Sequence, residues 1–193
     1  MAPGGINLTL KSNSYEKERE EALLRAARSG ALSRFEVQLE RGEHDVRRLW
    51  LRPNVVSQLA RESVGEDQFF RVQAALRRFV VGGLFNVVSK TCSHAGVSNL
   101  GDLRELKTDP PPFVEMRFKP PRRDLRIFGR FICQDGLVLT SAGMKSLEEK
   151  TVGKPIKSPE ELRRCEAFFK AQAFESRWIP PSIEASITNA KII

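Results

Sequence analysis

Residues 110–146 read PPPFVEMRFKPPRRDLRIFGRFICQDGLVLTSAGMKS, and this stretch decides the fold. Apolar and charged side chains alternate after its three prolines, in the order Val114, Glu115, Met116, Arg117, Phe118 and Lys119. A period of two predicts a half-buried strand. Residues 125–133 and 137–141 predict two further strands, joined by Asp135-Gly136, a pair that tolerates positive φ in a tight hairpin. The stretch therefore predicts a three-stranded antiparallel meander.

The meander is strongly basic. Between Phe113 and Arg130, six basic residues against Glu115 and Asp124 leave a net charge of +4, and they are Arg117, Lys119, Arg122, Arg123, Arg126 and Arg130. Arginine suits phosphate because its planar guanidinium donates two parallel hydrogen bonds. The alternative is a solvated sheet face whose charges discourage pairing between edges.

The hairpin turn predicts which side chains face one another. If Gln134 lies opposite Leu137, Arg130 lies across from Ser141, at the end of the sheet that leads to Lys145. This register would bring basic side chains of three strands to one place.

Helix signals flank the meander. Ser158-Pro159-Glu160-Glu161 is a capping box that predicts a helix with a buried stripe, made of Leu162, Cys165, Phe169 and Ala173. Before the meander, the clearest helix starts near Asp67 and carries apolar residues at three- and four-residue spacing, which are Phe69, Val72, Leu76, Phe79 and Val80.

Weaker signals fill the first half. Residues 1–13 predict a loose arm, and a charged helix follows from Ser14 to Gly30 with an apolar stripe at Leu23, Leu24 and Ala27. FEVQL at 35–39 predicts a strand, 44–51 fits either strand or helix, and Pro53 opens a helix with Val56, Leu59 and Ala60 inside. LFNVVSK at 84–90 predicts one or two further helical turns.

Together these elements predict an α+β domain. Its sheet is small and antiparallel, the meander plus an N-terminal strand, and helices pack on one face and leave the other free for a ligand. We divide the chain into an N-terminal arm and helix (1–33), the domain (34–177) and a C-terminal tail (178–193).

The composition of the chain limits the classes of partner and location that we expect. The chain has 193 residues and a formal charge of +8, which favours polyanions such as nucleic acid as partners. It has no apolar run of roughly 18 residues that would span a bilayer and no secretory signal, and its three cysteines are too few for a disulfide framework. We expect no membrane association and a cytoplasmic location.

Cys92 and His94 lack a C-x-x-C partner, and Gly143-Met144-Lys145-Ser146 lacks the glycine spacing of a phosphate loop, so we expect neither metal nor cofactor.

Four segments, in this order, resemble the RelE/ParE toxin superfamily and its HigB-like, phage-derived branch. They are Phe113-Val114-Glu115-Met116-Arg117, Leu125-Arg126-Ile127-Phe128, Leu137 to Ser146, and Ser158-Pro159-Glu160-Glu161. The order and spacing match over residues 100–175. Gly143 stands where that branch usually has an aromatic residue, and Ser146 where it usually has a second lysine.

The resemblance implies a RelE-like fold and an activity. The toxin would be a metal-independent endoribonuclease of a type II toxin–antitoxin system that cuts mRNA on the ribosome and is held inactive by a cognate antitoxin protein. Arg117 and Arg126 would hold the scissile phosphate, Lys145 would assist as a charge or acid, and Glu115 is the nearest carboxylate. The flanking basic residues would bind RNA, namely Lys119, Arg122, Arg123 and Arg130.

Two alternatives remain open. The first is a non-catalytic module that keeps the fold and binds nucleic acid or a protein through the charged sheet, which the absence of the second lysine favours. The second is a ParE-like inhibitor of a protein target such as gyrase.

Overall fold

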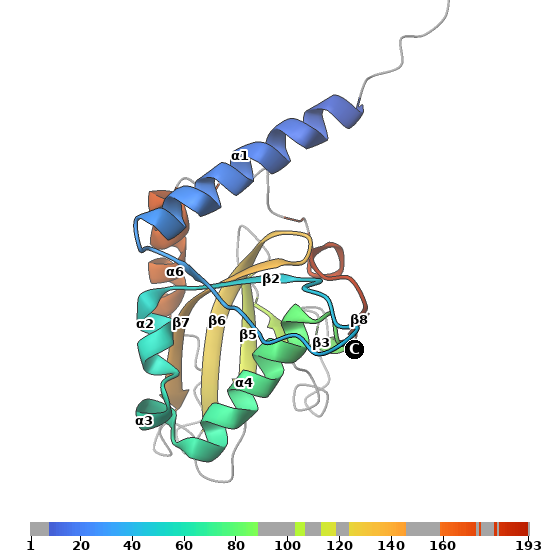
Figure 1. The fold of residues 1–193 in the computed structure, drawn as a ribbon. Coiled ribbons are helices and arrows are strands. Elements are labelled where there is room, and N and C mark those ends of the chain that lie inside the picture. Colours follow the sequence, from blue (N-terminus) through green and yellow to red (C-terminus); the bar gives the residue numbers. More distant parts are fainter. Residues whose placement is uncertain are drawn as a thin grey trace, which may run out of the picture.

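The computed structural model describes residues 8–88, 103–106, 113–118, 124–145, 159–172, 174, 180 and 182–192 (Figure 1). Its helices are α1 (Leu8–Arg28), α2 (Pro53–Gln58), α3 (Arg61–Val64), α4 (Glu66–Val80) and α6 (Pro159–Ala171), with a 3₁₀ turn at Glu184–Ser186. Its strands are β1 (Ser33–Arg34), β2 (Arg48–Leu51), β3 (Phe85–Val88), β4 (Leu103–Glu105), β5 (Phe113–Phe118), β6 (Asp124–Cys133), β7 (Gly136–Lys145) and β8 (Ala190–Ile192).

All of these strands belong to one mixed sheet. Eight strands follow the order β1-β2-β7-β6-β5-β4-β3-β8. β5, β6 and β7 pair antiparallel at its centre, whereas β2 runs parallel to β7, and β3 runs parallel to both β4 and β8. The prediction of a small antiparallel, RelE-like sheet is therefore wrong. The meander exists, but parallel pairs between distant segments extend it, and local periodicity does not reveal such pairs.

Helices cover both faces of the sheet. In Figure 1, α4 crosses the near face and α6 lies behind it. On the α4 face, the core joins α2, α3 and α4 to apolar residues of β2 to β7, and Val72, Leu76 and Phe79 at its centre are fully buried. On the other face, α1 and α6 pack on a second core around Phe113, Phe128 and Val138. The prediction that one face is left free is wrong for this end of the sheet.

The structure contains the three predicted strands of the meander, but their register differs from the prediction. Cys133 pairs with Gly136, so the two-residue loop is Gln134-Asp135, and Asp135 itself takes a φ of 57°. Arg130 lies opposite Val138, not Ser141, because the turn pairs Cys133 with Gly136 and the ladder shifts register between Phe131 and Cys133. A β-bulge of this kind inserts an extra residue into one strand, and alternation in the sequence does not show where.

α4 matches its prediction closely. It begins at Glu66, after Gly65 as N-cap, and Val72, Leu76, Phe79 and Val80 are buried on one side. Gly82 takes a φ of 79° just beyond the helix end. The chain then forms β3, so the prediction of further helical turns at 84–90 is wrong. Phenylalanine and adjacent valines favour a pleated, buried surface over a helix, which explains the outcome.

Three smaller predictions also change. α1 starts at Leu8, so residues 8–13 are helical, and its buried side is Ala22, Leu23 and Ala26, whereas Leu24 is 44% exposed. The strand expected at 35–39 does not form, and the short strand β1 lies just before it at Ser33–Arg34. In α2 the buried valine is Val55, and Val56 faces outward.

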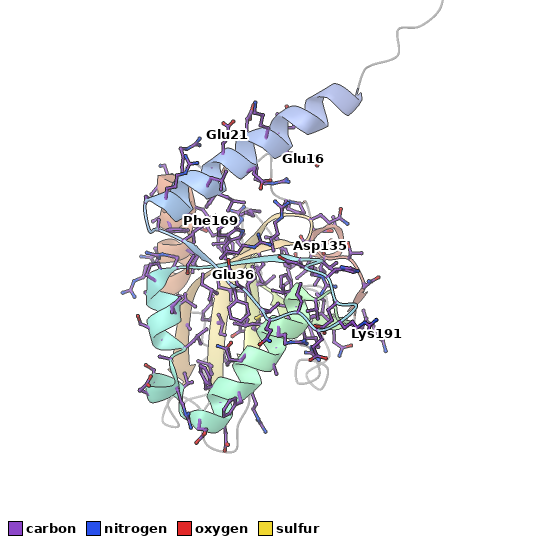
Figure 2. The ribbon with its side chains drawn as sticks, in the orientation of Figure 1. Glu16, Glu21, Glu36, Asp135, Phe169 and Lys191 are labelled. Carbon is purple, nitrogen blue, oxygen red and sulfur yellow. The ribbon has the colours of Figure 1, made fainter. Side chains whose placement is uncertain are left out.

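The C-terminal segment docks onto the hairpin turn through a buried arginine. The Arg47 side chain is fully buried, and it donates hydrogen bonds to the backbone oxygens of Phe79 (3.2 Å), Gly83 (2.9 Å) and Thr188 and to the Asp135 carboxylate (3.2 Å). Burial lowers the pKa of the Arg47 guanidinium, and the charge of Asp135 raises it. Asp135 also accepts a hydrogen bond from the Thr188 backbone amide at 2.8 Å, and Figure 2 shows it on the same side of the molecule as Lys191 of β8.

Candidate nucleic-acid interface

A buried carboxylate lies between two arginines at the centre of the sheet. Glu115 of β5 is 1% exposed. One of its oxygens accepts a hydrogen bond from Arg117 Nε at 2.7 Å, and the other accepts one from Arg126 Nη1 at 2.8 Å. The sequence placed these three residues in one site, and they are in direct contact.

The strand register explains why the carboxylate is needed there. Arg117 and Arg126 are opposite one another in the β5–β6 ladder, and two like charges at such a position repel. Glu115 precedes Arg117 by two residues, so it lies on the same face and can reach both guanidinium groups. Its charge offsets one of theirs, and its pairing fixes the direction of both side chains.

A third arginine adjoins this group from the next strand. Arg104 of β4 pairs in register with Glu115, and its side chain is half-buried. We call Arg104, Glu115, Arg117 and Arg126 the β5 charge cluster, and their formal charges sum to +2. The side chains of Arg117 and Arg126 are 18% and 11% exposed. The contact with Glu115 engages Nε of Arg117 and Nη1 of Arg126.

In the third strand of the meander, the residue that pairs with Arg126 is a glycine. Gly143 of β7 pairs with Arg126, and Lys145 pairs with Asp124 at the end of the same ladder. Lys145 is thus two residues along β7 from the glycine beside the cluster, although its side chain lies outside the described part of the structure. Gly143 adds no side chain to this row beside Arg126.

Arg130 lies apart from the cluster, under aromatic rings. It is 5% exposed, with its guanidinium carbon 4.8 Å from the centre of the Phe113 ring and 5.7 Å from that of Phe169 in α6. Burial lowers the pKa of Arg130, and the charge of Glu166 raises it. These contacts make Arg130 part of the packing between α6 and the sheet. The other predicted RNA-binding residues, Lys119, Arg122 and Arg123, lie outside the described residues.

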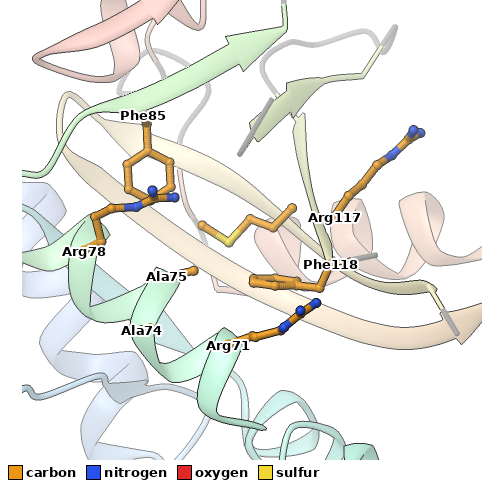
Figure 3. A pocket seen from close by; sticks show the side chains of 8 residues that line it. Arg71, Ala74, Ala75, Arg78, Phe85, Arg117 and Phe118 are labelled. Atoms are coloured by element: carbon orange, nitrogen blue, oxygen red, sulfur yellow. The ribbon is translucent and has the colours of Figure 1, made fainter. Parts of the chain in front are cut away.

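A basic pocket on the opposite face was not predicted from the sequence. It has a volume of about 430 Å³ and lies between α4 and strands β3 and β5 (Figure 3). Its polar lining comes from Arg71 and Arg78 of α4 and Arg117 of β5, and its rings are Phe85 and Phe118. Arg71 and Arg78 are seven residues apart, a spacing that places both on one side of a helix, but the sequence alone did not show that β5 lies opposite them.

The described residues hold no group of three or more histidine, cysteine or acidic side chains that could bind a metal ion. Within the same part of the chain, none of the helices combines the length and the apolar character required to cross a bilayer. The Cys133 thiol is partly buried, and burial raises its pKa, with the nearby charges of Arg19 and Arg48 acting in the opposite direction. A raised pKa argues against a nucleophilic role for this cysteine.

The chain matches no protein-family model, no curated protein sequence and no solved structure. The resemblance to the HigB-like toxins therefore stays a prediction from the four sequence segments. Independently of that resemblance, the structure shows two basic features, the β5 charge cluster and the basic pocket on the opposite face of the sheet.

Proposed function

We propose that this protein is a metal-independent endoribonuclease that cuts mRNA, acting as the toxin of a type II toxin–antitoxin pair. The observation that carries the proposal is the β5 charge cluster, in which one buried carboxylate aims two arginines that face one another across adjacent strands. The overall charge of +8 supports an RNA partner. The cognate antitoxin and the ribosome belong to the proposal through the sequence resemblance.

Arginines suit the chemistry of RNA cleavage. The 2′-oxygen bonds to phosphorus, the bond to the 5′-oxygen breaks, and the pentacoordinate transition state carries additional negative charge. Donors already fixed in direction stabilise such charge better than mobile ones, because they need no reorganisation during the reaction. In our proposal Arg117 and Arg126 contact the non-bridging phosphate oxygens through the guanidinium donors that face away from Glu115.

Glu115 takes a positioning role in this scheme. A general base must reach the 2′-hydroxyl proton, and Glu115 is 1% exposed with both oxygens occupied by arginine donors. Its contribution is to hold the two guanidinium groups, while the 2′-hydroxyl proton passes to solvent. Lys145 stays the predicted partner for the leaving 5′-oxygen.

Expression of the chain in a bacterial host tests the proposal. We expect arrested growth and new 5′ ends within mRNA, and we expect both to disappear in an Arg117→Gln variant. This substitution leaves Glu115 paired with Arg126, so it removes a phosphate ligand without isolating a buried charge. Arg117→Lys should keep part of the growth arrest and of the mRNA cleavage, since lysine keeps the positive charge but not the planar guanidinium fork.

A matched control is Arg61→Gln, which removes one exposed positive charge far along the chain from the cluster. It should arrest growth as the wild type does. Normal growth and unchanged mRNA ends with the wild-type chain at high expression would contradict the proposal.

One observation favours a second candidate, a non-catalytic module that binds RNA. The carboxylate of the cluster is engaged by two arginines, which leaves the cluster with cations for binding but no base for catalysis. Purified protein that binds RNA but leaves it intact would support this candidate over the nuclease.

A further inference from the structure

The pocket between α4 and β5 has the chemistry of a nucleotide site. Arg71, Arg78 and Arg117 line it, and none of the lining residues that the structure describes is acidic. Its floor is apolar, formed by Met116 and by two alanines of α4. A space with cationic walls and an apolar floor fits a ligand that has both an anionic group and a flat apolar part.

Two small residues keep this pocket open. Ala74 and Ala75 face it from α4, where longer side chains would fill the space (Figure 3). Gly83 serves the same end, because a Cβ at this position would lie 2.5 Å from Cγ of Arg78 and displace that side chain. The glycine thus lets Arg78 lie over the Phe85 ring, with its guanidinium carbon 4.7 Å from the ring centre.

The planar groups of the pocket suit a nucleobase. Phe85 is 1% exposed and lies beneath Arg78, so the guanidinium plane presents the outer surface of that stack. Phe118 is only partly buried, and Figure 3 shows it close to Arg71. Bases stack on phenylalanine rings and on guanidinium planes, and a nearby arginine can pair with the phosphate.

Arg117 borders both the pocket and the β5 charge cluster. Its side chain bonds through Nε to Glu115 on the α6 face and points away from the pocket (Figure 3). The pocket and the cluster therefore lie on opposite faces of the sheet.

We infer that this pocket binds one nucleotide of single-stranded RNA. The base stacks between Phe118 and the Arg78 guanidinium, and Arg71 pairs with its phosphate. The inference rests on the proposed function, which it extends by assigning a base-binding subsite on the face of the sheet opposite the β5 charge cluster.

Binding of a fluorescein-labelled single-stranded RNA of twelve nucleotides tests the inference, measured by fluorescence anisotropy on the full chain. Arg71→Gln and Phe118→Leu should each weaken binding about tenfold, since a lost stacking or phosphate contact is worth that much. The matched controls are Arg61→Gln for charge and Phe70→Leu for the ring, because Arg61 pairs with Glu66 and Phe70 is 56% exposed outside the pocket. Both controls should bind within twofold of the wild type.

A further arm identifies the base as the ligand. Adenosine monophosphate should compete with the labelled RNA at lower concentration than inorganic phosphate, and Phe118→Leu should reduce this difference because it removes the ring on which the base stacks. If Arg117→Gln weakens RNA binding while the two pocket variants bind as the controls do, the pocket inference is wrong and the proposed function stands. If the wild-type chain binds no RNA, both are wrong.

Discussion

Glu115 shows how one side chain determines the chemistry of its neighbours. Its carboxylate allows two arginines to lie opposite one another in the interior of a sheet, an arrangement that repulsion would otherwise oppose. Because the carboxylate is buried, the pairing depends on both partners, and loss of the acid would leave two adjacent cations with little solvent around them.

Glu115→Gln should lower the free energy of unfolding by about 3 kcal/mol, since removal of one partner from a buried ion pair leaves uncompensated charge. Urea denaturation followed by circular dichroism measures the change. Glu20→Gln is the control, because Glu20 is 54% exposed in its pair with Arg48 and should change stability by less than about 0.5 kcal/mol. Equal effects of the two substitutions would contradict the role given to Glu115.

Arg47 is the second residue on which the fold depends. Arg47→Met should cost about 3 to 5 kcal/mol, because it leaves the Asp135 carboxylate and several backbone oxygens without their donor. Hydrogen exchange should show faster exchange at the Thr188 amide before global unfolding. Arg48→Met, at an exposed position next in the chain, serves as the control; unchanged exchange at Thr188 in the Arg47 variant would show that the arginine does not hold the C-terminal segment.

At the scale of elements, Gly129 lies where β6 packs tightly against the backbone of β7. A Cβ there would lie 2.5 Å from the backbone oxygen of Val138 and 2.8 Å from Cδ2 of Leu139. Since the closest atom belongs to the backbone of a central strand, it cannot move without disturbing the ladder.

Gly129→Ala should therefore destabilise the protein by roughly 2 to 3 kcal/mol, as overpacking of a buried site does. Gly42→Ala is the comparison: nothing lies within 4 Å of its Cβ, so only its positive φ opposes the substitution, at a cost of about 1 kcal/mol. Thermal unfolding of both variants measures the difference, and a smaller loss at Gly129 than at Gly42 would refute the close-packing argument.

Local patterns were sufficient for some elements and not for others. The alternation from Val114 to Phe118 predicts β5, and the three- and four-residue spacing predicts α4, because each pattern reflects the face that the element buries. The sequence predicts helix at β3 since its four residues, three of which are apolar, follow a helix. The register of β6 and β7 escaped prediction because a bulge has no consistent sequence signature.

At the scale of the whole molecule, the tertiary structure explains why the sequence predicts some residues of the site and not others. Glu115, Arg117 and Arg126 lie on one hairpin, so alternation alone brings them together. Arg104 joins this cluster because β4 pairs with β5. Arg71 and Arg78 line the basic pocket because α4 packs on the sheet. Both arrangements depend on contacts between separate elements. The burial of Arg130 follows from α6 covering the second face, which the prediction of a one-sided sheet did not allow.

The salt dependence of RNA binding tests the central claim most directly, that the β5 charge cluster holds an RNA phosphate. For a single strand, the slope of log K against log salt concentration is about −0.7 for each phosphate neutralised. We predict that purified wild-type protein binds the twelve-nucleotide RNA with a clear negative slope and that Arg117→Gln reduces its magnitude by about 0.7, whereas Arg61→Gln leaves it unchanged. A slope that is the same in wild type and Arg117→Gln, or no binding at low salt, would contradict the account.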